Sequence, residues 1–261
     1  MPDINEFTYG WLTPALAYLL SVIGSLLALR CMTRARTSPK PRGWIITAAV
    51  ALGGTGIWVM HFVAMLGFSV HDGSVRYNVP ITLLSAMLAV VVVWFGLRVV
   101  VRRQGGTYSL LIGGTITGLG VAAMHYAGMY AMKTTVPMTY DFWIVLLSVV
   151  IAIAAATAAL WFALHIHGML ASVGAALIMG VAVTGMHYTG MYAMHTHSEG
   201  AMTGMSMPAG ATAHALLTPL IIGVSMVTIL MFLQVGITDP EEPDLQRVRR
   251  QRASRYWPSG N

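Results

Sequence analysis

Residues 109–132 read SLLIGGTITGLGVAAMHYAGMYAM, a stretch without a single Asp, Glu, Lys or Arg. At about 1.5 Å per residue, a helix of this length crosses a hydrocarbon core of about 30 Å. Six further stretches of similar length are equally free of charge, at about 11–29, 44–70, 79–97, 142–164, 168–194 and 215–237. The sequence therefore predicts an all-α integral membrane protein, a seven-transmembrane helix bundle.

The composition of the whole chain agrees with this prediction. Of its 261 residues, 56% are hydrophobic and 9% are charged, whereas soluble domains carry about 25% charged residues. A single cysteine, Cys31, excludes a disulfide framework, a Cys-rich zinc site and covalent haem attachment. The unusual feature is the presence of 19 methionines and nine histidines, because both side chains are metal ligands and thioethers favour copper.

The basic residues predict the orientation of the bundle. Thirteen of the 15 fall between the first and second helices, between the third and fourth, or after residue 237, and only Arg76 and Lys133 lie in the opposite loops. Under the positive-inside rule, the N-terminus is outside and the C-terminus inside. The net charge of +6 then reflects topology and lipid headgroups, so a nucleic-acid partner is not expected.

Three parts follow from this topology. Residues 1–10 form an extracytoplasmic N-terminus, residues 11–237 the seven-helix domain, and residues 238–261 a basic cytoplasmic tail. The first helix does not read as a cleavable signal peptide, because Asp3 and Glu6 make its N-terminal flank acidic. The tail is too short to fold as a domain, so we expect a stand-alone form without a fused output domain.

One motif recurs on the second, fourth and sixth predicted helices. It reads MHFVAM at 60–65, MHYAGM at 124–129 and MHYTGM at 186–191, so the copies lie 64 and 62 residues apart. This spacing gives three helix-pair repeats, and it places every copy at similar depth on helices that run in the same direction. We therefore expect the three histidines to lie at one level near the outer face.

Helical geometry indicates what each copy offers. A histidine and the methionine four residues later share one helix face, so imidazole and thioether can reach one ion. The methionine before each histidine points about 100° away, and it either serves a neighbouring site or only packs. Small residues at Gly54, Gly118 and Gly180, and again two positions later, lead us to expect that the three motif helices approach one another closely.

The repeated signature resembles the Met-His-Tyr-Thr (MHYT) domain, an integral membrane sensor family of bacteria, over about residues 11–237. The resemblance implies a multi-pass sensor of the bacterial inner membrane that binds one or two copper ions. It further implies a response to a diatomic gas (O2, CO or NO) or to redox state. The metal ligands that it nominates are Met60, His61, Met65, Met124, His125, Met129, Met186, His187 and Met191, with Tyr126 and Tyr188 as cofactor-binding residues.

Two departures from the family pattern qualify this interpretation. Phe62 replaces the tyrosine of the first copy and Ala64 replaces its glycine, so that copy offers no phenol. Many members of the family also carry cyclic di-GMP or kinase domains, and none follows within these 261 residues. The signal is therefore expected to pass to a separate cytoplasmic or membrane partner.

A second cluster of metal ligands lies in the longest predicted outer loop, about 195–214. It contains His195, His197, Met202, Met205 and Met207. Two interpretations of these residues remain open. They form a secondary copper-capture site, or they belong to a Gly-rich loop whose methionines contact lipid or protein.

Two other functions also remain open at this point. A copper-handling membrane protein would need a relay of ligands across both leaflets, and a haem b-binding redox protein would need two imidazoles facing each other across a porphyrin. No carboxylate lies within any predicted span, so we do not expect an enzyme. A copper-binding sensor fits the residues best.

Overall fold

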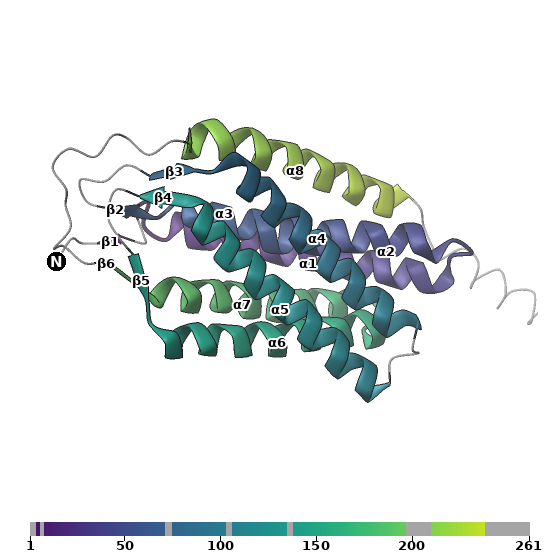
Figure 1. The fold of residues 1–261 in the computed structure, drawn as a ribbon. Coiled ribbons are helices and arrows are strands. Elements are labelled where there is room, and N and C mark those ends of the chain that lie inside the picture. Colours follow the sequence, from purple (N-terminus) through teal and green to yellow (C-terminus); the bar gives the residue numbers. More distant parts are fainter. Residues whose placement is uncertain are drawn as a thin grey trace, which may run out of the picture.

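The computed structural model describes residues 4–5, 8–70, 75–102, 106–134, 138–196 and 210–237. Within these ranges, seven helical rods are long and apolar enough to cross a membrane, and they form one bundle (Figure 1). The predicted all-α, seven-helix membrane architecture is thus confirmed. The rods are α1 (Leu12–Thr37), α2–η1–α3 (Pro41–Met65), α4 (Val79–Arg102), α5 (Thr107–Ala131), α6 (Phe142–His165), α7 (Met169–Tyr192) and α8 (Ala213–Ile237).

The second rod is not uniformly α-helical. It begins as α2 (Pro41–Ala49), continues as the π-helix η1 (Val50–Val59) and ends as α3 (Met60–Met65), which is the first copy of the motif. The π-helical part is held from two sides, because Trp58 donates to Ser85 of α4 over 3.0 Å and the hydroxyls of Thr55 and Thr228 of α8 form a hydrogen bond. π-Helical turns are rare and often lie at functional sites.

Gly56, Gly118 and Gly180, which precede the motif on its three helices, contact helices that carry no motif. A Cβ atom on Gly118 would lie 2.4 Å from the backbone of Ile153 in α6, and one on Gly180 would lie 2.7 Å from a side chain of α1. The second rod meets α1 in the same way, where a Cβ on Gly24 would lie 2.4 Å from Gly56. The expectation that these small faces bring the three motif helices together is therefore wrong: they seat each motif helix against its neighbours.

Short antiparallel strands gather at one end of the bundle, at the left in Figure 1. One strand directly follows each motif helix at this end, and strand pairing ties the connecting segments to one another, which helps to hold the three copies at a common level. The strands are β1 (Ile4–Asn5), β2 (Ser69–Val70), β3 (Val75–Tyr77), β4 (Met132–Thr134), β5 (Met138–Tyr140), β6 (Met194–Thr196) and β7 (Ala211–Thr212). One sheet has the order β4-β3-β7, and two further pairs are β1-β2 and β5-β6.

Arginines of α1 link helices at the opposite end of the bundle. Arg34 donates to the carbonyl of Val235 in α8, and Arg36 donates to the carbonyl of Ala163 in α6. A tight turn joins α6 to α7 there, and Gly168 allows it with a φ of +83°. The two helices are antiparallel neighbours, as the short turn predicts (Figure 1). Which end faces the cytoplasm stays a prediction from the charge distribution.

Candidate metal centre

The three motif histidines meet at one point inside the bundle. Their Nδ1 atoms form a triangle with sides of 2.9 Å (His61 to His187), 3.2 Å (His125 to His61) and 3.3 Å (His187 to His125). Each side chain is only 1% exposed. The prediction that the three histidines lie at one level is confirmed, and among the described residues they are the only group of three or more His, Cys, Asp or Glu with converging ligand atoms.

Hydrogen bonds between neutral imidazoles cannot account for all three sides of this triangle. An Nδ1 atom that carries a proton donates it and has no lone pair left with which to accept. One protonated Nδ1 can therefore serve two sides at most, and the third side then brings two lone pairs together. A cation at the centre removes this conflict, because it accepts all three lone pairs.

The size of the triangle suits one metal ion. Imidazole nitrogens that share a tetrahedral ion at about 2.0 Å lie about 3.3 Å from one another. The observed sides of 2.9–3.3 Å reach this value at their upper end. Three protein nitrogens on one ion also leave a position for a further ligand, as in sites that bind a small molecule.

Two kinds of neighbour hold the imidazole rings in place. The aromatic residue that follows each histidine contacts the ring edge-on, with centroids 4.8–4.9 Å apart, and Phe62 does so as well as Tyr126 and Tyr188. Ring contact is thus common to the three copies, while the phenol is present in only two.

The second neighbour is the glycine of the next copy. A Cβ on Gly128 would lie 2.4 Å from Nε2 of His61, and a Cβ on Gly190 would lie 2.3 Å from Nε2 of His125. Only glycine leaves room for these rings. Both glycines stand three residues after a histidine, and this spacing was visible in the sequence. Spacing within one helix does not show which residue of another helix the glycine contacts.

At Nε2, two of the three rings are held by packing and not by a hydrogen bond. The Nε2 atoms of His61 and His125 are buried, and no hydrogen-bond partner for them lies among the described residues. A buried polar nitrogen without a partner costs free energy. An interaction at Nδ1 is therefore needed to favour this arrangement of the rings.

Methionines surround the triangle along the helices. All six flanking thioether side chains are 1–2% exposed: Met60, Met65, Met124, Met129, Met186 and Met191. Met65, Met129 and Met191 stand one helical turn from the histidines, on the side of the short strands. Soft ligands thus lie between the histidine triangle and the end of the bundle that carries the strands.

The two candidate tyrosines lie beside the triangle rather than in it. The hydroxyl of Tyr126 forms a 2.6 Å hydrogen bond with Ser148 of α6, a helix that contributes no histidine. Tyr188 is half-buried, and its ring contacts His187. Burial, together with the neighbouring Tyr126, raises the pKa of Tyr140 on β5, so this phenol gives up its proton less readily than a free one.

The secondary capture residues are only partly described. His195 lies on β6 at the strand end of the bundle, exposed to the surroundings and apart from the triangle. His197, Met202, Met205 and Met207 lie outside the described residues. Their role as a copper-capture site stays a prediction.

Comparison with known proteins identifies the repeats. The family model for the MHYT "Bacterial signalling protein N terminal repeat" matches residues 54–113 and 118–176. The chain is 40% identical over 194 residues, 71% of its length, to the bifunctional diguanylate cyclase/cyclic di-GMP phosphodiesterase MucR of Pseudomonas aeruginosa. It is also 36% identical over 198 residues, 73% of its length, to the cyclic di-GMP phosphodiesterase NbdA of the same organism.

A third relative matches a longer part of the chain. The signaling protein YkoW of Bacillus subtilis is 30% identical over 235 residues, 86% of this chain. The matched region amounts to 28% of MucR, 25% of NbdA and 29% of YkoW, so the chain spans about a quarter of each relative. No solved structure matches it.

Proposed function

Because the chain belongs to the MHYT family of bacterial signalling proteins, we propose that its sensing element is a copper centre held by His61, His125 and His187. The chain is a multi-pass protein of the bacterial inner membrane, and its MHYT region is a signalling domain. The observation that carries the copper proposal is the closed triangle of three buried Nδ1 atoms.

The donor set favours copper over other metals. Imidazole suits zinc, copper, iron and nickel, whereas thioether ligands select Cu(I). The neighbourhood of the triangle supplies thioethers from Met65, Met129 and Met191, and the transmembrane spans carry no carboxylate. Magnesium, calcium and manganese, which prefer oxygen ligands, are poorly matched to such a site.

The geometry favours a single ion over haem b. Two imidazoles that ligate one haem iron from opposite faces, each at about 2 Å, lie about 4 Å apart with the porphyrin between them. The histidine nitrogens here approach to 2.9–3.3 Å, and the neighbouring rings and glycines fill the surrounding space. This spacing supports a single small ion and argues against the haem alternative.

The proposed signal is a diatomic gas or a change of redox state. Bound copper would supply a redox-active ion with a position open to a ligand such as O2, CO or NO. The chain's own part is to hold three nitrogens in one plane of the bundle, to offer soft sulfurs one turn away and to exclude water. Burial of all three histidines supports this role.

The proposed receiver of the signal is an enzyme of cyclic di-GMP metabolism. Two of the relatives are named for making or breaking cyclic di-GMP, and this chain matches only about a quarter of each. We infer that the membrane domain itself is not the catalyst and that it regulates such an enzyme, through a separate partner or through another domain.

Metal analysis of the purified protein, combined with optical and paramagnetic spectra, tests this function. We expect bound copper on the order of one ion per chain, no haem absorption band, and spectra that change when CO, NO or O2 is added. A haem band in place of copper, or a protein that takes up no metal, would refute the copper centre. If the spectra of the bound copper change neither with any of the three gases nor with the redox state, the sensing role is refuted and copper handling is left as the function.

A further inference from the structure

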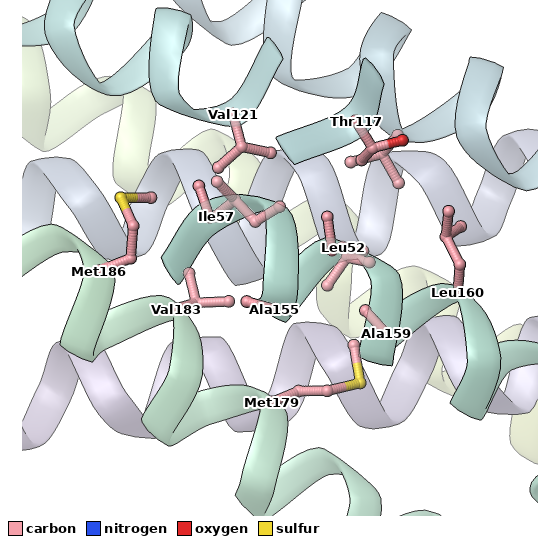
Figure 2. Close-up of a pocket in the computed structure, with 13 residues that line it drawn as sticks. Leu52, Ile57, Thr117, Val121, Ala155, Ala159, Leu160, Met179, Val183 and Met186 are labelled. Carbon is pink, nitrogen blue, oxygen red and sulfur yellow. The ribbon is translucent and has the colours of Figure 1, made fainter. Parts of the chain in front are cut away.

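An apolar cavity of about 40 Å³ lies inside the bundle, between η1, α4, α5, α6 and α7 (Figure 2). Its only polar lining group is the hydroxyl of Thr117, which faces the carbonyl of Val92 at 3.4 Å. Buried water needs about two to four polar partners. This cavity offers at most one, so it suits an apolar occupant.

The cavity lies next to the histidine triangle, further from the short strands. Ile57, Val121 and Val183 line it, and each stands four residues, or one helical turn, before a motif histidine. Met186, the neighbour of His187 in the chain, lines the same end (Figure 2). The cavity lining at this end therefore lies about one helical turn from the three imidazoles.

The size and position of the cavity indicate a small gas molecule. A water needs about 10–15 Å³, and a cavity that takes benzene or xenon in another protein measures about 150 Å³. This cavity falls between these limits, and a run of alanines on α6 leaves the space open. Diatomic gases are apolar and prefer hydrocarbon to water, so they are available at this depth in the membrane.

We propose that this cavity is a binding site for a diatomic gas, which it holds one helical turn from the triangle and delivers to the metal from within the bilayer. Binding in the cavity needs no metal. Delivery rests on the proposed function, because it requires copper at the three histidines. The two parts can be tested on the same preparation.

Xenon is the probe for the binding part, because it fills apolar cavities without chemistry. Xenon NMR of the full chain in lipid nanodiscs, with empty nanodiscs as the blank, should reveal a bound population. Ala155→Leu fills the cavity and should weaken xenon binding by about tenfold or more. Ala154→Leu changes the exposed neighbour on the same helix and should leave xenon binding unchanged. If Ala155→Leu does not fold, Ala159→Val gives a milder filling of the same space.

The delivery part is measured on copper-loaded protein at equal copper content. Ala155→Leu should slow the spectral response to CO, while Ala154→Leu should respond at the wild-type rate. A wild-type protein that carries copper but binds no xenon, or an Ala155→Leu protein with undiminished xenon binding, would overturn the cavity site and leave the copper centre intact. Xenon binding in a protein that takes up no metal would instead refute the copper centre and keep the gas site.

Discussion

Gly128 and Gly190 decide how closely the imidazoles approach one another. Each glycine accepts the Nε2 edge of a histidine from the preceding repeat, so the copies interlock across the bundle. The first copy has Ala64 at the corresponding position, which shows that the interlocking is not identical in all three. The triangle thus depends on residues that bind nothing themselves.

Gly190→Ala should disturb the site without unfolding the helix. Its new Cβ would lie 2.3 Å from Nε2 of His125 and must displace that ring, whereas alanine inside a helix is intrinsically favourable by about 1 kcal/mol over glycine. We expect copper affinity to fall by about tenfold or more. Gly185→Ala on the same helix meets no atom within 4 Å and is the control. Equal copper affinity in the two variants, measured by chelator competition, would show that the glycine does not position the ring.

The methionines one turn from the histidines should determine which metal is retained. Replacing Met65, Met129 and Met191 together by Leu keeps the volume and removes three soft ligands, at a cost of usually less than about 1.5 kcal/mol per site. We expect weaker Cu(I) binding with Zn(II) binding nearly unchanged. The matched control replaces three lipid-exposed methionines, Met87, Met169 and Met226, by Leu. If both triple variants retain Cu(I) equally, these thioethers only pack.

At the scale of elements, the sequence predicted the helices well and the strands not at all. The absence of charge marks a helix span, although α1 continues to Thr37 because Arg30, Arg34 and Arg36 extend its last turns. The strands have only two or three residues each, too few for a periodic pattern. The π-helix of residues 50–59 also leaves no composition signal, since its residues are as apolar as those of an α-helix.

The predicted outer segment should assist capture without forming the main site. Three histidines complete the triangle without it, so replacing Met202, Met205 and Met207 together by Leu should slow copper loading and leave the final stoichiometry nearly unchanged. Time courses of copper uptake measure both quantities, with the Met87, Met169 and Met226 triple variant as control. A complete loss of bound copper would mean that the main site lies in this segment.

At the scale of the whole molecule, the orientation follows from charge. Thirteen of 15 basic residues fall in the segments predicted to be cytoplasmic, so the N-terminus should be outside and the C-terminus inside. A periplasm-dependent phosphatase fused after Gly73 should be active, and the same enzyme fused after Gln104 or after Ile237 should be inactive. The reverse pattern would place the strand end of the bundle in the cytoplasm.

The site was predictable in its residues but not in its construction. The repeat of Met-His at intervals of 64 and 62 residues identified His61, His125 and His187. The repeat did not reveal that α1, α4 and α6 separate the motif helices along much of their length. Small residues such as Gly118 indicate close packing, but not which helix packs against them. Nor could the repeat locate the cavity, which depends on side chains from five elements.

The central claim is that three histidines hold copper together, and copper content of single variants tests it most directly. His61→Ala, His125→Ala and His187→Ala should each lose most of the bound copper, because two nitrogens hold the ion far less firmly than three. His165→Ala is the control, since His165 lies at the opposite end of the bundle and stacks on Trp161. If all three variants fold, reach the membrane and keep as much copper as the wild type, the triangle is not a metal centre.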